Sequence, residues 1–467
     1  MSIILSIIYL IATVTFVFGL KMLGHPETAK KGNLISAVGM VIAIIGTIFF
    51  HDFEVPLINY LLIGSALLVG TIIGWLIAVK VEMTKMPELV SLFNGFGGGS
   101  ALLIGLVEFG KNVGVEDSMK LSSSIITTIL AAIIIGSITF TGSLIAWAKL
   151  NGSMNDIRLP KYNLINNVFF LGLIVFGTYI VMQGADSFVL IYLLLFAALA
   201  YGVLFVIPIG GADMPVVISL LNSLTGIAAA ITGILYGNMV MLVGGILVGS
   251  AGLILTFVMC NAMNRSLSNV IFGAFGGDSA TGAVSAGKTG GTIKKTTASD
   301  SAILLNYANK VVIVPGYGLA VAQAQHIIHE LELLLIKKGV DVSYAIHPVA
   351  GRMPGHMNVL LAESKVDYDK LIEMDDINPQ FPNTDVVLVV GANDVVNPAA
   401  HNDPSSPIYG MPILDVENAR HIIVNKRSMN AGYAGIENEL FFNQKTSMLF
   451  GDAKSALTEL VSELRNM

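Results

Sequence analysis

The sequence predicts a polytopic α-helical membrane bundle of about nine spans, followed by an α/β domain with a parallel sheet. Only 12% of the 467 residues are charged, whereas a soluble domain carries about 25%. The charge is also unevenly spread: of the 26 basic and 32 acidic residues, only 22 lie in residues 1–272. Beyond residue 300, short β-branched runs alternate with helical stretches. The two halves of the chain are therefore adapted to different solvents.

Nine apolar runs define the first half. A helix needs about 20 mainly apolar residues to cross the hydrocarbon core of a bilayer. Runs of that kind lie at residues 3–22, 33–50, 57–79, 87–107, 123–147, 163–183, 187–208, 215–236 and 238–260. The first run lacks the basic start and the small-residue cleavage site of a signal peptide, so we expect it to be retained. Residues 1–262 are interpreted as a transmembrane domain surrounded by the lipid bilayer.

Basic residues orient the bundle, because cytoplasmic loops of membrane proteins carry an excess of Lys and Arg. With the first loop inside, only Lys111 and Lys120 fall on the outer side. The cytoplasmic side then collects Lys21, Lys30, Lys31, Lys80, Lys85, Lys149, Arg158, Lys161 and Arg265. This asymmetry predicts that everything after the ninth run, including the α/β domain, lies in the cytoplasm.

Polar side chains inside apolar runs are candidates for function, because they are costly in hydrocarbon. Asn94 lies midway along the fourth run and Asn222 midway along the eighth. Asp213 stands in the loop at the cytoplasmic end of the eighth run. Structural explanations remain open: an interhelical hydrogen bond for each asparagine, and a helix N-cap or a solvated loop acid for Asp213. The glycines at 95–99 predict a close helix crossing rather than a phosphate loop.

Composition excludes several classes of site. The single cysteine, Cys260, rules out an internal disulfide and a Cys-based metal cluster. None of the eight histidines lies inside an apolar run, and we expect no bound metal. The net charge of −6 arises entirely beyond residue 272, which leaves no strongly basic surface for nucleic acid.

The second half begins with a stretch rich in Gly, Ser, Thr, Ala and Lys. Residues 263–299 cannot bury a core and are interpreted as a flexible linker. Residues 300–467 form the α/β domain, with a helix expected after the first strand up to Lys338 and a closing amphipathic helix at 453–464. Strands are expected at 311–314, 341–346, 385–390, 421–425 and 447–450. This order is typical of a parallel sheet with helices on both faces.

A glycine motif follows the first expected strand: Gly316-Tyr317-Gly318-Leu319-Ala320-Val321. It is the dinucleotide fingerprint of a Rossmann-like fold, in which the first glycine allows a tight turn, the second admits a pyrophosphate, and the following helix offers N–H groups. Val321 replaces the third glycine and implies looser packing of the helix on the strand. A tight turn without a ligand is the alternative interpretation.

Basic groups follow two later strands. An NAD site usually places a carboxylate after its second strand to bind the ribose 2′-hydroxyl, whereas this chain continues from His347 to Arg352 without one. A later strand is followed by Lys426-Arg427-Ser428, whose donor fork, point charge and hydroxyl suit a phosphate monoester. Tyr433, flanked by glycines, suits a loop that covers a nucleotide. These features favour NADP over NAD, with an exposed basic loop as the structural alternative.

Together these segments resemble the beta-subunit family of proton-translocating NAD(P) transhydrogenase. Residues 210–217, 316–325, 347–363, 391–394, 396–400 and 426–435 carry the resemblance. It implies an enzyme of the cell inner (plasma) membrane that couples hydride transfer between NAD(H) and NADP(H) to proton translocation. Hydride transfer needs two nicotinamides in contact, and this chain has one credible dinucleotide site. NADP(H) would bind this chain, and an alpha subunit would supply NAD(H) within a dimer of alpha–beta units.

The resemblance also implies roles for individual residues, with the nucleotide reversed relative to ordinary Rossmann enzymes. The residues implied in NADP(H) binding are Gly316, Tyr317, Gly318, Leu319, Ala320, Val321, Arg352, Gly391, Asn393, Asp394, Lys426, Arg427, Ser428 and Tyr433. Among them, residues 316–320 would approach the pyrophosphate, and Lys426, Arg427 and Ser428 would hold the 2′-phosphate. Asp394 would lie near the nicotinamide and serve proton-dependent switching. Asn222, Asp213 and Asn94 match positions of the proton path, although some family members have His where this chain has Asn94.

An alternative from another class is an ion channel or transporter whose Rossmann-like domain only senses nucleotide. It predicts solute flux without hydride exchange and needs a cavity with a charged or aromatic lining, which the apolar runs do not offer. A quinone-linked dehydrogenase would need a flavin or metal site. The lone Cys260 and the lack of His clusters speak against it.

Overall fold

The structure is a computed structural model. It describes residues 3–24, 26–50, 55–111, 121–154, 157, 162–184, 187–210, 213–264, 266–267, 293–353, 355–406, 408–432 and 435–467. The chain divides into two compact units, Met1–Ile209 with Val217–Ile254 and Gly210–Val216 with Leu255–Met467.

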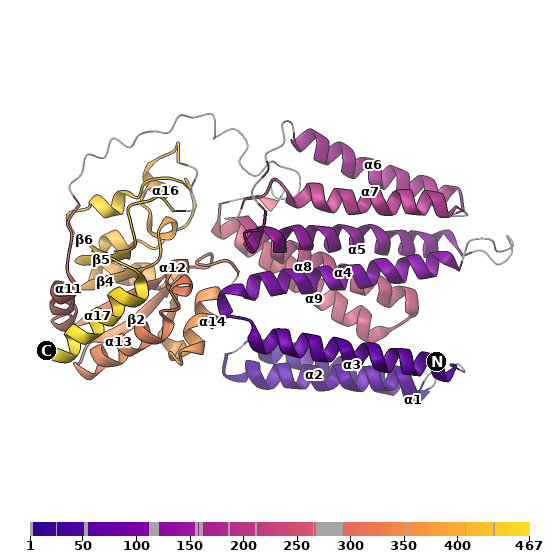
Figure 1. Ribbon diagram of the computed structural model, residues 1–467, viewed down its shortest axis with the longest axis horizontal. Coiled ribbons are helices and arrows are strands. Elements are labelled where there is room, and N and C mark those ends of the chain that lie inside the picture. Colours follow the sequence, from indigo (N-terminus) through magenta and orange to yellow (C-terminus); the bar gives the residue numbers. More distant parts are fainter. Residues whose placement is uncertain are drawn as a thin grey trace. The chain divides into compact units, whose positions relative to one another are not determined.

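Nine helices among the described residues are long and apolar enough to cross a membrane (Figure 1). They are α1 (Ile3–Leu23), α2 (Pro26–Phe49), α3 (Leu57–Lys80), α4 (Met86–Gly110), α5 (Ser123–Leu150), α6 (Tyr162–Met182), α7 (Phe188–Val206), α8 (Met214–Tyr236) and α9 (Met239–Ala262). Each coincides with one expected apolar run. Only α2 begins much earlier than its run, because its polar first turns continue the same helix beyond the hydrophobic stretch. The nine-span prediction is confirmed.

Small residues let these helices approach closely. A Cβ added at Gly98 of α4 would lie 2.8 Å from the carbonyl oxygen of Gly136 in α5. Likewise a Cβ at Gly226 of α8 would lie 2.3 Å from the backbone nitrogen of Gly249 in α9. Backbones come this close only where side chains are absent, which is how membrane helices associate without a hydrophobic drive. The glycine run of α4 is therefore a helix crossing, as predicted.

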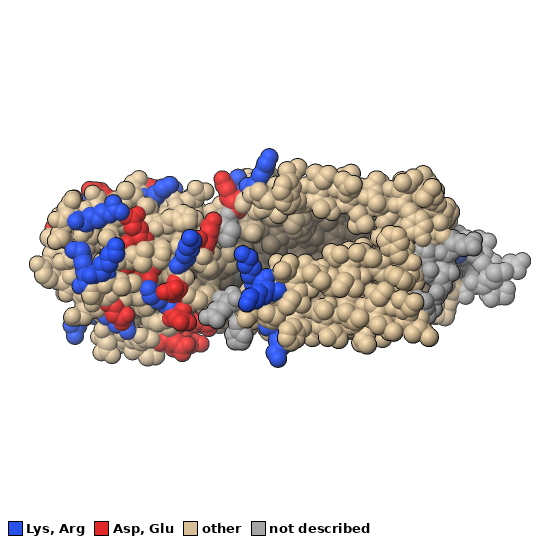
Figure 2. Space-filling model, turned by 90° about the horizontal axis from the view of Figure 1, so that it is seen from below, with Lys and Arg blue, Asp and Glu red and all other residues tan. Residues whose placement is uncertain are grey.

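Lipid exposure explains the outer surface of the helices. In Figure 2 the visible sides of the long helices carry no Lys, Arg, Asp or Glu away from the helix ends, whereas both signs of charge gather over the sheet domain. Helix α3 has no buried residue, although its mean hydropathy is 2.3. Apolar side chains exposed on this scale would make a soluble protein aggregate, so the protein is a multi-pass membrane protein.

A six-stranded parallel sheet forms the centre of the second half, with strand order β3-β2-β1-β4-β5-β6. The strands are β1 (Lys310–Pro315), β2 (Asp341–Ile346), β3 (Leu371–Glu373), β4 (Val386–Val390), β5 (His421–Lys426) and β6 (Thr446–Phe450). In register, Val311 of β1 lies between Val342 of β2 and Val386 of β4. The strand order reverses between β1 and β4, which makes the carboxyl ends of these two strands the switch point where such folds bind dinucleotides.

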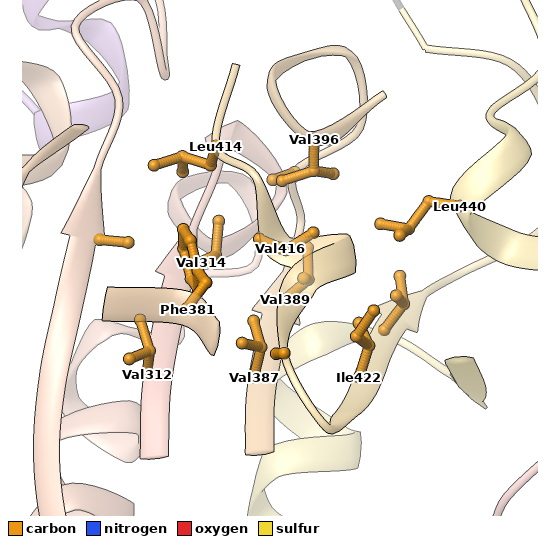
Figure 3. Packing of buried hydrophobic residues seen from close by; sticks show 14 of the residues in the cluster. Val312, Val314, Phe381, Val387, Val389, Val396, Leu414, Val416, Ile422 and Leu440 are labelled. Carbon is orange, nitrogen blue, oxygen red and sulfur yellow. The ribbon is translucent and has the colours of Figure 1, made fainter. Parts of the chain in front are cut away.

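Helices and short turns cover both faces of the sheet. The α-helices are α11 (Ala298–Asn306), α12 (Tyr317–Val321), α13 (Gln325–Lys337), α14 (His356–Glu363), α15 (Met374–Ile377), α16 (Ala399–Asn402) and α17 (Ala453–Asn466). Helices α11, α13 and α17 pack together, and α13 and α17 contact the strands. Alternate strand residues on one face join a buried cluster with side chains from the connecting turns. Figure 3 shows Val312, Val314, Val387, Val389 and Ile422 packed with Phe381, Val396, Leu414, Val416 and Leu440.

Two segments differ from the expected elements. The helix expected from the first strand to Lys338 is broken, because Gln323 takes a left-handed conformation with φ +49°. The N–H groups of Gln323 and Ala324 then bond to Ala320 and Leu319, which closes α12 as a left-handed helix end does. Of the expected linker, the described residues 293–299 include a pairing with β6, in which the Met448 N–H donates to Lys294 O at 2.8 Å. Residues 268–292 lie outside the described part of the chain.

Candidate functional site

Three glycines bring the turns after β1 and β4 into backbone contact at the switch point. The Gly316 N–H donates to Val390 O and the Gly318 N–H to Gly391 O, both at 2.9 Å. A Cβ added at Gly316 would lie 2.4 Å from Gly391 O, and one at Gly318 would lie 2.6 Å from Gly391 Cα. Gly391 itself has φ +68°, a conformation that favours glycine. The fingerprint glycines therefore form a close-packed seat at the carboxyl edge.

Helix α12 is shorter than the fingerprint suggests. It has five residues and buries Leu319 and Ala320, so its dipole is weaker than that of a full helix. Val321 is 45% exposed, and the looser packing of the helix on the strand, expected from the missing third glycine, stays a prediction.

The loop after β2 places Arg352 over the aromatic ring of Tyr317. The guanidinium carbon lies 4.6 Å from the ring centroid, within the range of a cation–π contact. The Arg352 backbone N–H donates to His356 Nδ1 at 3.1 Å, so the ring proton of a neutral His356 sits on Nε2. Burial and the nearby Arg352 lower the pKa of His356. This loop therefore presents one permanent cation, that of Arg352, at the carboxyl edge.

His347, at the end of β2, is a structural imidazole. It is 2% exposed, and burial lowers its pKa to about 4. Its Nδ1 accepts the Val349 N–H at 3.2 Å, so Nε2 carries the proton and donates to Pro412 O at 2.9 Å. The ring ties the loop after β2 to the segment before β5 and supplies neither a charge nor a carboxylate.

The turn after β4 meets the loop that follows β5. A Cβ added at Gly432 would lie 2.2 Å from Asn393 Nδ2 and 2.7 Å from Asp394 Oδ1. The Asn438 side chain donates to Asn393 O at 2.9 Å, and Asn397 Nδ2 donates to Glu437 O at 3.1 Å. Sequence reasoning missed Asn438 and gave Asn397 no role. Asn397 lies within a segment that carries the family resemblance, and Asn438 lies three residues beyond another such segment. Nothing else in the sequence distinguishes these two amides.

Strand β5 delivers the three predicted phosphate ligands. The Lys426 ammonium lies 4.7 Å from the Phe441 ring centroid. Burial lowers the pKa of Lys426, and the carboxylate of Asp394 opposes that shift. Arg427 and Ser428 are exposed, and Ser428 Oγ accepts the Asn430 N–H. The expected Tyr433 lies outside the described residues.

In the bundle, the structure brings the helices of Asn94 and Asn222 together. Thr225 Oγ1 of α8 donates to the backbone oxygen of Asn94 in α4 at 3.2 Å. Asn222 is half-buried and lies three residues before Thr225, hence on the same side of α8. Asn94 is buried, and its Nδ2 finds no acceptor among the described residues. Asp213 is buried directly before α8, and its N–H donates to Gly210 O.

No group of three His, Cys, Asp or Glu side chains in the described part of the chain could hold a metal ion. The charged groups at the carboxyl edge are instead spread over three strand ends: Arg352 after β2, Asp394 after β4, and Lys426 with Arg427 at the end of β5. Such an edge can hold an elongated anion across several strand ends.

Comparison with known proteins covers both halves of the chain. Residues 5–463 match the family model of the NAD(P) transhydrogenase beta subunit. Two proteins of Rhodospirillum rubrum, one of them from a named strain, are each called NAD(P) transhydrogenase subunit beta. Each is 46% identical to this chain over 460 residues, which is 98% of this chain and 98% of the relative. All predicted site residues lie within the matched range 5–463.

Proposed function

Because the chain belongs to the NAD(P) transhydrogenase beta-subunit family, we propose that it binds NADP(H) at the carboxyl edge of its sheet, opposite an NAD(H)-binding alpha subunit. The enzyme transfers hydride between the two nucleotides and couples this transfer to proton translocation. The family match favours this function over the channel or transporter considered from the sequence.

The contact between the turns of β1 and β4 is the observation that carries the nucleotide site. Gly316, Gly318 and Gly391 let these two turns pack backbone to backbone, because an added Cβ atom at any of them would clash with the facing turn. This close contact lies at the point where a dinucleotide lies across such a sheet. Asn393 Nδ2 is buried nearby and has no acceptor among the described residues. A buried donor normally has a partner, and an oxygen of the nucleotide would provide one. The residues present therefore fit a dinucleotide.

The preference for NADP follows from what surrounds the strand ends. No carboxylate follows β2, where His347 is buried and neutral. Lys426, with the exposed Arg427 and Ser428, offers two cations and a hydroxyl for a 2′-phosphate. Arg352 would line the pocket beside Tyr317. We assign the 2′-phosphate to Lys426, Arg427 and Ser428.

When bound, the nicotinamide rings supply the hydride chemistry, and this chain binds and orients the phosphorylated nucleotide. Asp394 lies against Gly432, and its negative charge raises the pKa of Lys426. Protonation of Asp394 would remove the negative charge beside Lys426 and thereby change how strongly the edge holds an anion. The protonated and ionised states of Asp394 would then differ in nucleotide affinity, which links proton binding to nucleotide binding.

The proposed proton path involves Asn94 of α4 and Asn222 of α8, together with Asp213, which directly precedes α8 in the chain. Neutral amides do not themselves take up protons near pH 7, so bound water would carry the proton between them. The buried Asn94 Nδ2, which has no acceptor among the described residues, is a site that such a water can satisfy. Polar groups of this kind inside a bundle mark ion pathways in membrane proteins.

An alpha subunit with the NAD(H) site and further membrane helices completes the enzyme, and we propose a dimer of alpha–beta units. The proposed location is the cell inner membrane, and the excess of basic residues on one side of the spans supports a cytoplasmic sheet domain. The sheet domain then faces the soluble nucleotide pool.

Calorimetry on the full-length chain in detergent tests the nucleotide assignment. We expect NADPH to bind at least tenfold more tightly than NADH, and equal affinities would overturn the 2′-phosphate site. Vesicles containing the chain and a co-expressed alpha subunit test the coupled reaction. NADH-driven reduction of an NADP analogue should accelerate when an uncoupler removes the opposing proton gradient, whereas solute flux without hydride exchange would support the channel alternative.

A further inference from the structure

We infer that Asn438 is a positioning residue for nucleotide binding, because it turns the side-chain amide of Asn393 so that its N–H group faces the nucleotide. This inference rests on the proposed NADP(H) site and adds a residue to it. Asn438 lies after the loop that follows β5, and Asn393 lies in the turn after β4.

The hydrogen bonds of Asn438 identify its own amide atoms. Asn438 is 2% exposed, and its Oδ1 accepts the backbone N–H of Leu440 at 3.0 Å. Its Nδ2 donates to the backbone oxygen of Asn393 at 2.9 Å. A backbone N–H can only donate and a carbonyl can only accept, so these two partners allow one orientation of the Asn438 amide.

That orientation fixes the amide of Asn393 in turn. Asn438 Nδ2 also lies 3.2 Å from Asn393 Oδ1, and this contact needs an acceptor on the Asn393 side. The donor end, Asn393 Nδ2, therefore points the other way. It is buried, it has no acceptor among the described residues, and it lies beside Gly432 and next to Asp394. A donor held in this way is poised for an oxygen of the dinucleotide, because an unmet buried donor is costly.

Loss of the Asn438 bonds would free the Asn393 amide to rotate. A flip would place Asn393 Oδ1 where Nδ2 now lies, so that an acceptor would face the oxygen of the nucleotide. We expect at least a tenfold loss of NADPH affinity. The ratio of NADPH to NADH affinity should stay unchanged, because the 2′-phosphate is assigned to Lys426, Arg427 and Ser428.

Two substitutions test this role in the full-length chain. Asn438→Ser keeps a side-chain acceptor for the Leu440 N–H, because serine is also a good N-cap. Its shorter side chain cannot reach Asn393. Asn438→Asp keeps the size and the acceptor and replaces the donor by an oxygen. Asn443→Ser is the matched control, because Asn443 Oδ1 makes the same kind of bond to the Lys445 N–H away from Asn393. Calorimetry with NADPH and a thermal unfolding scan are recorded for each variant.

A double-mutant cycle separates positioning from a general effect on folding. If Asn438 acts through Asn393, Asn438→Ser should weaken binding tenfold in the wild-type chain and less than twofold in an Asn393→Ala background. Equal losses in both backgrounds, or wild-type affinity in Asn438→Ser, would overturn the inference alone. Failure of the wild-type chain to bind NADPH would instead overturn the proposed function, and the inference with it.

Discussion

The replacement of Gly391 by alanine probes the backbone contact on which the proposed nucleotide site is built. Gly391 has φ +68°. Its added Cβ would lie 2.4 Å from the backbone nitrogen of Leu319 and 2.5 Å from Gly318 Cα. Both neighbours are backbone atoms of the fingerprint turn, which cannot move aside as the end of a flexible side chain can.

The expected cost has two parts. A non-glycine residue in the left-handed region costs about 1–2 kcal/mol, and forcing an extra carbon into a close-packed site costs about 1–3 kcal/mol more. Gly391→Ala should therefore destabilise the sheet domain by about 2–5 kcal/mol. Gly339→Ala is the matched control, because Gly339 has φ +87° and nothing lies within 4 Å of its added Cβ. That variant should show only the cost of the left-handed backbone conformation, about 1–2 kcal/mol.

Thermal unfolding of the full-length chain, together with hydrogen exchange in the sheet domain, measures the destabilisation caused by each variant. Gly391→Ala should also weaken NADPH binding, since separating the two turns displaces the seat of the nucleotide, whereas Gly339→Ala should bind normally. Equal destabilisation by the two substitutions would refute the reasoning. It would mean that the turns after β1 and β4 are free to separate without cost.

Three further predictions follow from charge and burial. The pKa of His347 is about 4 in the folded chain, against 6.5 in the unfolded chain. The part of the folding free energy that depends on a neutral His347 is therefore complete above about pH 6.5 and declines as the pH falls towards about 4. The domain should lose about 2 kcal/mol between pH 7 and pH 5, and His347→Gln should remove that part of the pH dependence in thermal scans. Glu332 is fully buried and binds Lys370 Nζ at 2.5 Å, so Glu332→Gln should cost about 3 kcal/mol. Glu330→Gln, which breaks a more exposed ion pair with Arg465, should cost under about 1 kcal/mol; equal unfolding midpoints of the two variants would contradict this. Asn222→Leu should retain NADPH affinity and lose proton-coupled turnover in vesicles, and normal pumping would remove Asn222 from the proposed path.

Hydropathy and β-branched runs predicted the elements of this protein because burial dominates both halves. The nine spans follow from apolar length alone, and five strands were expected within two residues of their ends. Strand β3 was missed, since three residues are too few for a pattern. The break at Gln323 was also missed, because glutamine seldom adopts positive φ and its neighbours give no sign of a stop.

The site was predictable to the extent that its residues lie in motifs at strand ends. Gly316, Arg352 and Lys426 each follow a strand and were expected at one nucleotide site, because parallel strands bring their carboxyl ends to one edge. Asp394 was expected there only from the family resemblance. The hydrogen bonds of Asn438 were beyond prediction. They join segments 45 residues apart, and nothing in the local pattern distinguishes a buried bridging amide from a solvated one.

The turn after β4 is shared by both halves of the proposed site, and its two sides differ in stiffness. On one side Gly391 meets Gly316 and Gly318 through backbone atoms that leave no room even for a methyl group. On the other side Gly432 meets the side chains of Asn393 and Asp394, and side chains can rotate at modest cost. A change of nucleotide or of protonation at Asp394 would therefore be absorbed on the Gly432 side, while the fingerprint turn keeps its place. The orientation of Asn393 set by Asn438 then determines whether that softer side is ready to receive the nucleotide.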